Sequence, residues 1–297
     1  MPAISPLLSY AAQALGAYAR AQDGAISGES LRNADFTTAS AAHFLATWRV
    51  IASYEHSTEP YWVDDLETGS RLGPYSATNG LAVAVFENKS NHERVLAIRG
   101  TDDPYDIATD VISVAALGST RNQGQYQSLR TKVQEWVASG VLPAHFAVTG
   151  HSLGGFLAIG LALEFPQLVE HAYLYNAPGI GGLTGRTSIA EIARAYHISG
   201  ASVDPAKFTN LRAKPGTSLV AGLGEHPSPP ILVEGEDHGG WLVGTNNHSM
   251  KYLVDSLAIH DAFERLEGGA SVGLASIGRI VRDTRQPSDP GVRTPSN

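Results

Sequence analysis

The chain has 297 residues, of which 43% are hydrophobic and 17% charged, and its formal net charge is −8. This composition can supply a sizeable core and argues against disorder over most of the chain. Because no Lys/Arg cluster stands out, we expect no nucleic-acid partner. The sequence has no run of 18 or more apolar residues, so no transmembrane helix is expected. Cysteine is absent, which excludes disulfides and thiol chemistry.

The N-terminal part begins with a helical pattern and continues with strands. Apolar residues within 1–22 recur at helical spacing, and this stretch lacks the basic start and apolar block of a signal peptide. Strands are predicted over 47–54, 80–87 and 93–98. The last two are joined by a turn-like ENKSNH segment, which indicates a hairpin. The sheet should therefore begin with antiparallel strands.

Helices and strands then alternate. The expected order is a partly helical stretch at 106–117, a helix at 127–139, a strand at 145–149, a helix at 153–165, a strand at 172–175, a helix at 189–196, strands at 208–213 and 231–234, and an amphipathic helix at 249–266. This alternation predicts an α/β architecture, with a mostly parallel central sheet and helices on both faces. A domain over 1–267, which includes the N-terminal helical extension, would be followed by a flexible Gly-, Pro- and Ser-rich tail over 268–297.

The most informative motif is Gly150-His151-Ser152-Leu153-Gly154, between the predicted strand at 145–149 and the predicted helix at 153–165. G-x-S-x-G between a strand and a helix is typical of the nucleophile elbow of α/β-hydrolases. Two glycines without Cβ atoms would let the strand and the helix approach closely. The start of the helix would direct backbone N–H groups toward the place where an oxyanion forms. We therefore predict Ser152 as a nucleophile.

A serine nucleophile needs a base for its proton. In α/β-hydrolases the base is a histidine that follows both the serine and the acid in the chain. His248 stands on a loop directly before the last predicted helix, from which its imidazole can reach over the nucleophile. We predict His248 as the base. His226 and His238 are the alternatives, whereas His171 and His260 fall in or beside predicted elements and are interpreted as structural.

The oxyanion needs two donors. One should be the N–H of Leu153, the residue after the nucleophile, and the second should come from a loop after an earlier strand. Arg99-Gly100-Thr101 ends the predicted strand at 93–98 in the appropriate place, where Gly100 permits a tight backbone and Thr101 offers its N–H. An ordinary turn is the alternative interpretation.

Five segments carry a resemblance to a known family. They are Ala97–Thr101, Ile107–Asp110, Val148–Gly155, Asn176–Gly179 and Asn247–Ser249. With them the chain resembles the class 3 lipase-like α/β-hydrolases, in particular the bacterial lipase domains carried in secreted or repeat-containing proteins, over about residues 45–266. The resemblance implies an α/β-hydrolase fold and an ester hydrolase without a cofactor. In it Ser152 is the nucleophile, His248 the base, and Thr101 and Leu153 the oxyanion donors.

The chain departs from this family at the acid of the triad. The family's acid usually follows the strand that is here 208–213, where this chain has Lys214-Pro215-Gly216 and no carboxylate. The base must still be held in the correct tautomer and its cation stabilised. Glu234 is the first candidate, because it ends the predicted strand at 231–234 near the His248 loop. The remaining candidates are Asp237, Asp204, and a weaker dyad oriented by a backbone carbonyl or by Asn247.

The stretch 106–117 is either a lid that opens on a lipid surface or a plain core helix. Asp102, Asp103 and Asp110 flank or interrupt it, but their spacing fits no EF-hand loop, so no metal is expected. We therefore predict a serine esterase or lipase that acts on acyl esters, lipid-like in character, with transient contact to a lipid surface. The alternatives are a phospholipase A1 or thioesterase on the same site, or a catalytically inactive hydrolase that serves as a binding module. The resemblance suggests secretion.

Overall fold

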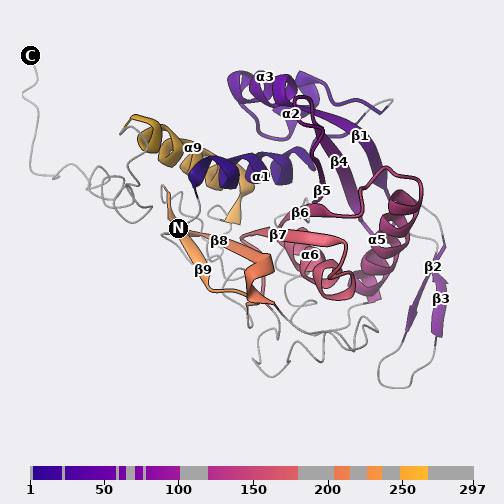
Figure 1. The fold of residues 1–297 in the computed structure, drawn as a ribbon. Coiled ribbons are helices and arrows are strands. Elements are labelled where there is room, and N and C mark those ends of the chain that lie inside the picture. The colour runs from indigo at the N-terminus through magenta and orange to yellow at the C-terminus, as the bar shows by residue number, and fades with distance from the viewer. Residues whose placement is uncertain are drawn as a thin grey trace, which may run out of the picture.

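The computed structural model describes residues 3–21, 24–57, 60–64, 71–75, 78–100, 120–179, 204–214, 226–235 and 248–266. Within these ranges a seven-stranded sheet has the order β1-β4-β5-β6-β7-β8-β9. Its strands are β1 (Trp48–Glu55), β4 (Ala82–Asn88), β5 (Arg94–Ile98), β6 (Phe146–His151), β7 (Val169–Tyr175), β8 (Phe208–Lys214) and β9 (Pro230–Glu234). β1, β4 and β5 pair antiparallel, and β5 to β9 pair parallel. A separate antiparallel hairpin, β2 (Tyr61–Asp64) and β3 (Arg71–Tyr75), lies beside α5 (Figure 1).

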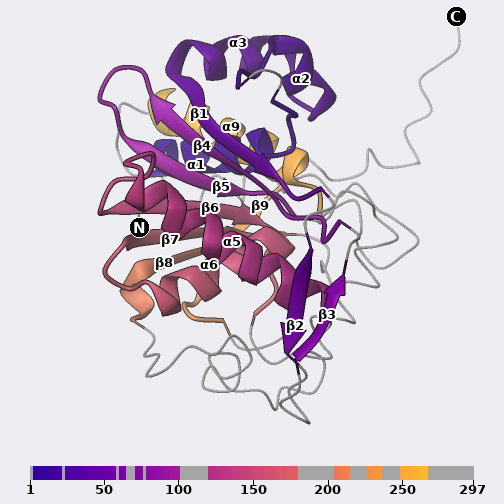
Figure 2. The ribbon, with the colours of Figure 1, turned by 90° about the vertical axis from the view of Figure 1, so that its right-hand side faces the viewer.

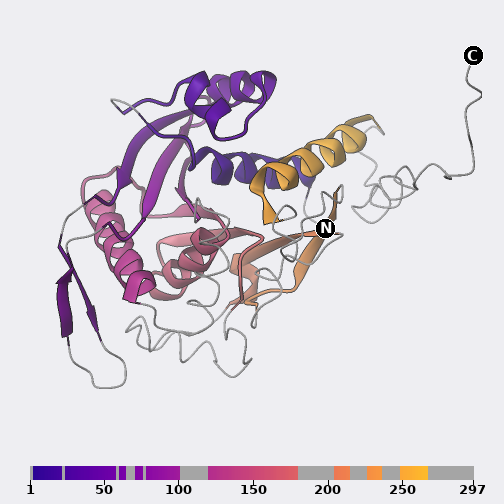
Figure 3. The same cartoon turned by 180° about the vertical axis from the view of Figure 1, so that it is seen from behind.

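Helices cover both faces of the sheet. They are α1 (Ile4–Gly16), α2 (Gly28–Asn33), α3 (Thr38–Thr47), α5 (Thr120–Ala138), α6 (Leu153–Glu164) and α9 (Met250–Leu266), and a short 3₁₀ turn, η2 (Pro205–Lys207), precedes β8. Figure 2 shows α5 and α6 in front of the sheet with α1 and α9 behind it. Figures 1 and 3 both show α1 and α9 side by side, although they come from the two ends of the described chain.

The central strands β4, β5 and β6 are buried on both faces because helices cover both faces of the sheet. Along β4, Val83 and Val85 join the core under α5 and α6, whereas Ala84 and Phe86 join the core under α1, α3 and α9. This alternation follows from the two-residue period of a strand. The sheet is therefore held between two cores, and the C-terminal edge of its parallel strands is left to carry a site, as is usual for open α/β sheets.

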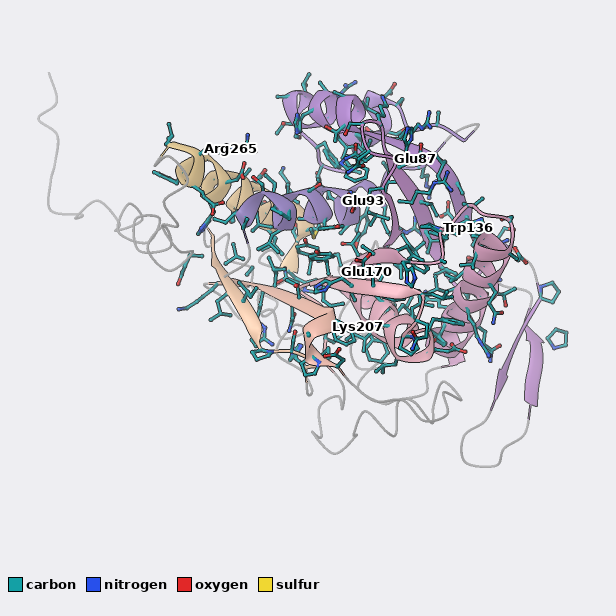
Figure 4. All side chains as sticks on the ribbon, viewed as in Figure 1. Glu87, Glu93, Trp136, Glu170, Lys207 and Arg265 are labelled. Atoms are coloured by element: carbon teal, nitrogen blue, oxygen red, sulfur yellow. The ribbon has the colours of Figure 1, made fainter. Side chains whose placement is uncertain are left out.

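The hairpin of β4 and β5 is confirmed, with Val83 opposite Ile98 and Glu87 opposite Arg94. The carboxylate of Glu87, which is 2% exposed, forms ion pairs with Arg49 and Arg94 at the end of the hairpin far from the strand edge that carries the elbow (Figure 4). The hydrogen bonds from these two guanidinium groups lower the pKa of Glu87 to about 2. This cluster stabilises the hairpin as a carboxylate–arginine network.

The predicted elements that fall within the described ranges are confirmed, with shifted ends. The α/β class and the mostly parallel sheet with helices on both faces are as expected. The structure adds elements that the sequence analysis did not predict, namely α2, α3, η2 and the β2–β3 hairpin. The stretch 106–117, the helix expected at 189–196 and the tail at 268–297 lie outside the described residues, so the lid and the division at residue 267 stay predictions.

Candidate active site

Ser152 occupies the turn between β6 and α6, with φ 55° and ψ −126°. Residues other than glycine rarely adopt positive φ, and such a conformation costs on the order of 1–3 kcal/mol. The turn is held by its backbone: the N–H of Ser152 donates to the carbonyl of Tyr175 at 3.0 Å, and the carbonyl of Ser152 accepts from Gly155 and Phe156. The strained serine therefore stands at the C-terminal edge of the sheet, at the start of a helix.

The glycines around Ser152 are required by close packing. A Cβ atom on Gly150 would lie 2.4 Å from the backbone of Gly154, and one on Gly154 would lie 2.2 Å from the carbonyl oxygen of Ile98. Real Cβ atoms do not approach backbone this closely. The motif thus lets α6 begin directly against β5 and β6, as the sequence predicts.

The structure brings Ser152 and His248 together. Nε2 of His248 lies 2.7 Å from Oγ of Ser152, within hydrogen-bond reach of a base and its nucleophile. The two residues are 3% and 2% exposed, respectively. Burial, together with the nearby His151 ring, lowers the pKa of His248 well below its ordinary value. The imidazole is consequently neutral at pH 7 and can accept the serine proton.

Two side chains hold the backbone of His248. Nε2 of His151 donates to the carbonyl oxygen of His248 at 2.7 Å, and Nδ2 of Asn176 donates to the same oxygen at 3.2 Å. Asn176 follows β7 at φ 46° and also accepts from the N–H of Ala213, so it links the ends of β7 and β8 to His248. Neither role was predicted from the sequence, although His151 lies inside the motif and Asn176 follows a predicted strand.

The three candidate acids differ in their positions. Oε1 of Glu234 lies 3.1 Å from Nζ of Lys214, its lateral neighbour on β8, and the described contacts do not join this carboxylate to His248. Asp204 caps η2 through the N–H of Ala206, at the N-terminal end of β8 and thus at the sheet edge opposite Ser152. Asp237 lies outside the described residues. Glu234 and Asp237 therefore stay predictions, and the position of Asp204 argues against it.

Three of the other histidines that follow Ser152 in the chain make structural contacts. His171 pairs with Thr209 across β7 and β8, and His260 donates to the backbone carbonyl of Glu234. His226 contacts the side chains of two β8 residues, Asn210 and Arg212. The alternative His238 lies outside the described residues.

Of the two expected oxyanion donors, the structure describes one. Leu153 is the first residue of α6, where the N–H groups have no partner within the helix and lie at the positive end of its dipole. Thr101 lies outside the described residues. The neighbouring N–H of Gly100 donates to the hydroxyl of Tyr18 at 3.2 Å, so this amide is already engaged.

The sheet order, its parallel β5–β9 part, and a serine at positive φ between β6 and α6 define an α/β-hydrolase fold that carries a serine–histidine pair. No family model matches the chain, and no curated protein matches its sequence. Within the described residues, no helix combines the length and apolarity needed to cross a membrane, and no cluster of three or more His, Asp or Glu residues could hold a metal ion.

Solved structures with a similar fold include three fungal lipases at low sequence identity. Lip2 lipase from Yarrowia lipolytica is 16% identical over 77% of this chain and 78% of its own, with a TM-score of 0.44. A triacylglycerol lipase from Penicillium expansum is 15% identical over 78% and 80%, with a TM-score of 0.42. The triacylglyceride lipase of Rhizomucor miehei is 12% identical over 77% and 80%, also at 0.42.

Proposed function

We propose that the chain is a serine carboxylester hydrolase in which Ser152 attacks the carbonyl carbon of an acyl ester. The observation that carries this proposal is the 2.7 Å contact between Oγ of Ser152 and a buried, neutral His248. Nothing in a packed core requires a serine at φ 55°, and strained residues of this kind gather at functional sites. The strain favours a nucleophile over a structural serine.

The proposed reaction runs in two halves. His248 takes the hydroxyl proton of Ser152 as the Oγ–carbonyl bond forms, and the tetrahedral oxyanion is stabilised by the N–H of Leu153 and by a second donor, for which we propose Thr101. The C–O bond to the alcohol then breaks, and His248 returns its proton to the leaving oxygen. Water, deprotonated by His248, hydrolyses the acyl-enzyme and regenerates the serine. This sequence needs no cofactor.

We propose acyl esters of lipid-like character as the substrate class, because the sequence resembles the class 3 lipase-like hydrolases. A panel of p-nitrophenyl esters of increasing chain length, an acyl thioester and a phospholipid would separate an esterase from a thioesterase or a phospholipase A1. We expect the highest kcat/KM on a carboxylic ester. Turnover confined to the thioester or the phospholipid would move the activity to those classes.

Ser152→Ala tests the proposal. It removes the nucleophile but not the backbone hydrogen bonds that hold the turn, so we expect a folded protein with no measurable ester turnover. Ser139→Ala is a matched control, because Ser139 follows α5 next to Gly140, whose carbonyl accepts from Arg94 at the start of β5, the end of that strand opposite the elbow. Unchanged turnover in Ser152→Ala would contradict the proposal. Absence of turnover in both the wild type and the variant, together with failure to react with a fluorophosphonate, would instead indicate an inactive hydrolase used for binding.

A further inference from the structure

A chain of hydrogen bonds runs behind the serine–histidine pair. The N–H of Gly100 reaches the hydroxyl of Tyr18 at 3.2 Å, and that hydroxyl lies 2.8 Å from Nδ1 of His151. Nε2 of His151 in turn lies 2.7 Å from the carbonyl oxygen of His248. Four segments that are distant in the sequence thus meet through two side chains.

Each link of this chain has one possible direction. A carbonyl oxygen only accepts, so Nε2 of His151 carries the hydrogen and donates to His248. A neutral imidazole with its hydrogen on Nε2 has an acceptor at Nδ1, so the O–H of Tyr18 donates to it. The tyrosine oxygen then accepts from the N–H of Gly100. Burial lowers the pKa of His151 to about 4, so the ring stays neutral at pH 7.

The absence of a Cβ on Gly100 makes room for this arrangement. A Cβ atom there would lie 2.7 Å from the hydroxyl of Tyr18, 2.6 Å from the carbonyl oxygen of His151 and 3.1 Å from Cβ of Ser152. Gly100 thus permits the backbone after β5, the tyrosine hydroxyl and the elbow to approach each other closely. The space that a Cβ atom on Gly100 would fill is therefore available to the Tyr18 hydroxyl beside the elbow, which supports the arrangement independently of the hydrogen bonds.

Hydrogen bonds between the sheet and α1 fix the position of Tyr18. It lies in the turn that ends α1, where its N–H donates to the carbonyl of Leu15. Two sheet side chains donate to carbonyls of α1: the hydroxyl of Tyr175 to Leu7 at 2.6 Å, and the hydroxyl of Thr149 to Tyr10 at 3.0 Å. Thr149 lies on β6, which leads into the elbow, and Tyr175 lies on β7, which pairs with β6. α1 therefore presents the tyrosine to the site on a rigid support.

We propose that Tyr18 and His151 are a positioning pair that holds the backbone of His248, and with it Nε2, in register with Ser152 and with the backbone at Gly100. This inference rests on the proposed function, because it assigns the pair to the same ester hydrolysis. Neither residue touches the reacting atoms in the proposed reaction. The pair acts through the placement of the base, and misplacement by about 1 Å can cost on the order of a hundredfold in rate.

Tyr18→Phe is the first test, because it keeps the ring and removes only the hydroxyl. We expect kcat for a p-nitrophenyl ester to fall about 10- to 100-fold with KM changed less than about twofold, since substrate binding is not the property affected. Tyr10→Phe is the matched control. It removes a hydroxyl on α1 that donates to Glu93, and it should keep wild-type kcat because Glu93 (labelled in Figure 4) precedes β5 at the sheet edge opposite the elbow. Wild-type kcat in Tyr18→Phe would overturn the inference.

His151 is tested by rescue. His151→Gln can keep an N–H donor for the His248 carbonyl, whereas His151→Leu cannot. We expect the glutamine variant to retain at least about tenfold more kcat than the leucine variant. Equal kcat in the two variants, both folded, would contradict a role through this hydrogen bond. If His151→Leu does not fold, wild-type kcat in Tyr18→Phe or loss of activity in His151→Gln equal to that of Ser152→Ala would overturn the inference.

The double variant Tyr18→Phe/His151→Leu separates a shared chain from two independent losses. If both residues act through the placement of His248, the double variant should be no slower than the slower single variant. Either substitution alone already interrupts the series of hydrogen bonds that leads to His248. Multiplied losses would contradict the pair. Rates are counted per fluorophosphonate-reactive site, so that an unfolded fraction does not enter kcat. Turnover that survives in Ser152→Ala would remove the proposed function itself, whereas inactivity of Ser152→Ala with unaffected Tyr18 and His151 variants would remove only this inference.

Discussion

The carbonyl oxygen of His248 accepts a hydrogen bond from Nε2 of His151 at 2.7 Å, so the residue beside the serine holds the backbone of the residue that faces the serine. The two imidazole rings are 4.8 Å apart between centroids. Both are buried, and burial lowers the pKa of both below the ordinary value. Two neutral histidines in contact make the site dependent on pH in two distinct ways.

The first dependence concerns activity. His248 must be neutral to take the proton of Ser152, and burial lowers its pKa well below 6.5. We therefore expect the acidic limb of kcat/KM to lie below pH 6.5, with full activity retained as the pH falls through that value. A pH profile on a substrate that does not ionise measures this limb. A limb centred at pH 6.5 or above would contradict the neutral, buried base.

The second dependence concerns stability. The pKa of His151 is about 4 in the folded chain against 6.5 for an ordinary histidine, so between these values the unfolded chain binds more protons. The free energy of unfolding therefore decreases as the pH falls from 6.5 toward 4, because protonation of His151 then favours the unfolded chain. Above pH 6.5 His151 is neutral in both states and no stability is lost through it. The shift corresponds to a loss on the order of 3 kcal/mol.

Denaturant unfolding at several pH values tests this linkage. His151→Gln should flatten the dependence of the unfolding free energy on pH between 4 and 6.5, whatever its absolute stability. His43→Gln, at an exposed position on α3, controls for the loss of one imidazole. An unchanged slope in His151→Gln would show that this histidine does not resist protonation in the folded chain.

Gly154→Ala tests the packing of the elbow. The added methyl would lie 2.2 Å from the carbonyl oxygen of Ile98, so α6 must move away from β5. We expect a loss of about 1–3 kcal/mol or more in unfolding free energy and a fall in ester turnover. Gly28→Ala is the control, because its nearest neighbour would be 3.6 Å away at Arg32, and we expect a change within about 0.5 kcal/mol. A Gly154→Ala variant as stable and active as the wild type would contradict the close approach.

Glu234→Gln addresses the acid. If Glu234 orients His248, kcat should fall by on the order of 10⁴, as expected when the imidazole loses its tautomer. Because Lys214 is 48% exposed, loss of their ion pair alone should change stability by less than about 1 kcal/mol. Asp204→Asn, at the opposite end of β8, should keep wild-type kcat. Wild-type kcat in Glu234→Gln with a large loss in Asp237→Asn would transfer the role to Asp237.

Local sequence patterns predicted much of the fold. The elbow was predictable because Gly150 and Gly154 bracket a serine between an apolar strand and an apolar helix, and the β4–β5 hairpin because a polar turn separates two apolar runs. The short helices α2 and α3 were missed, although Ser27 and Thr37 cap them through their hydroxyls. Helices of six and ten residues show too few turns for their periodicity to stand out.

The support behind the site was not predictable from local pattern. Tyr18 and His151 are 133 positions apart, and His151 and His248 are 97 positions apart. Neither contact follows from the spacing of residues within an element, because the first depends on how α1 packs across the sheet and the second on where the residues before α9 meet the end of β6. Ser152 could be inferred because it stands in the G-x-S-x-G motif. His248 could be inferred because it stands directly before the last predicted helix.

Covalent labelling of Ser152 tests the central claim most directly. The intact protein is treated with a fluorophosphonate and digested, and the modified peptide is identified by mass spectrometry. We expect a single adduct, on Oγ of Ser152, that is absent from Ser152→Ala and forms much more slowly in His248→Ala. A properly folded chain that forms no adduct, or forms it at another residue, would contradict the account.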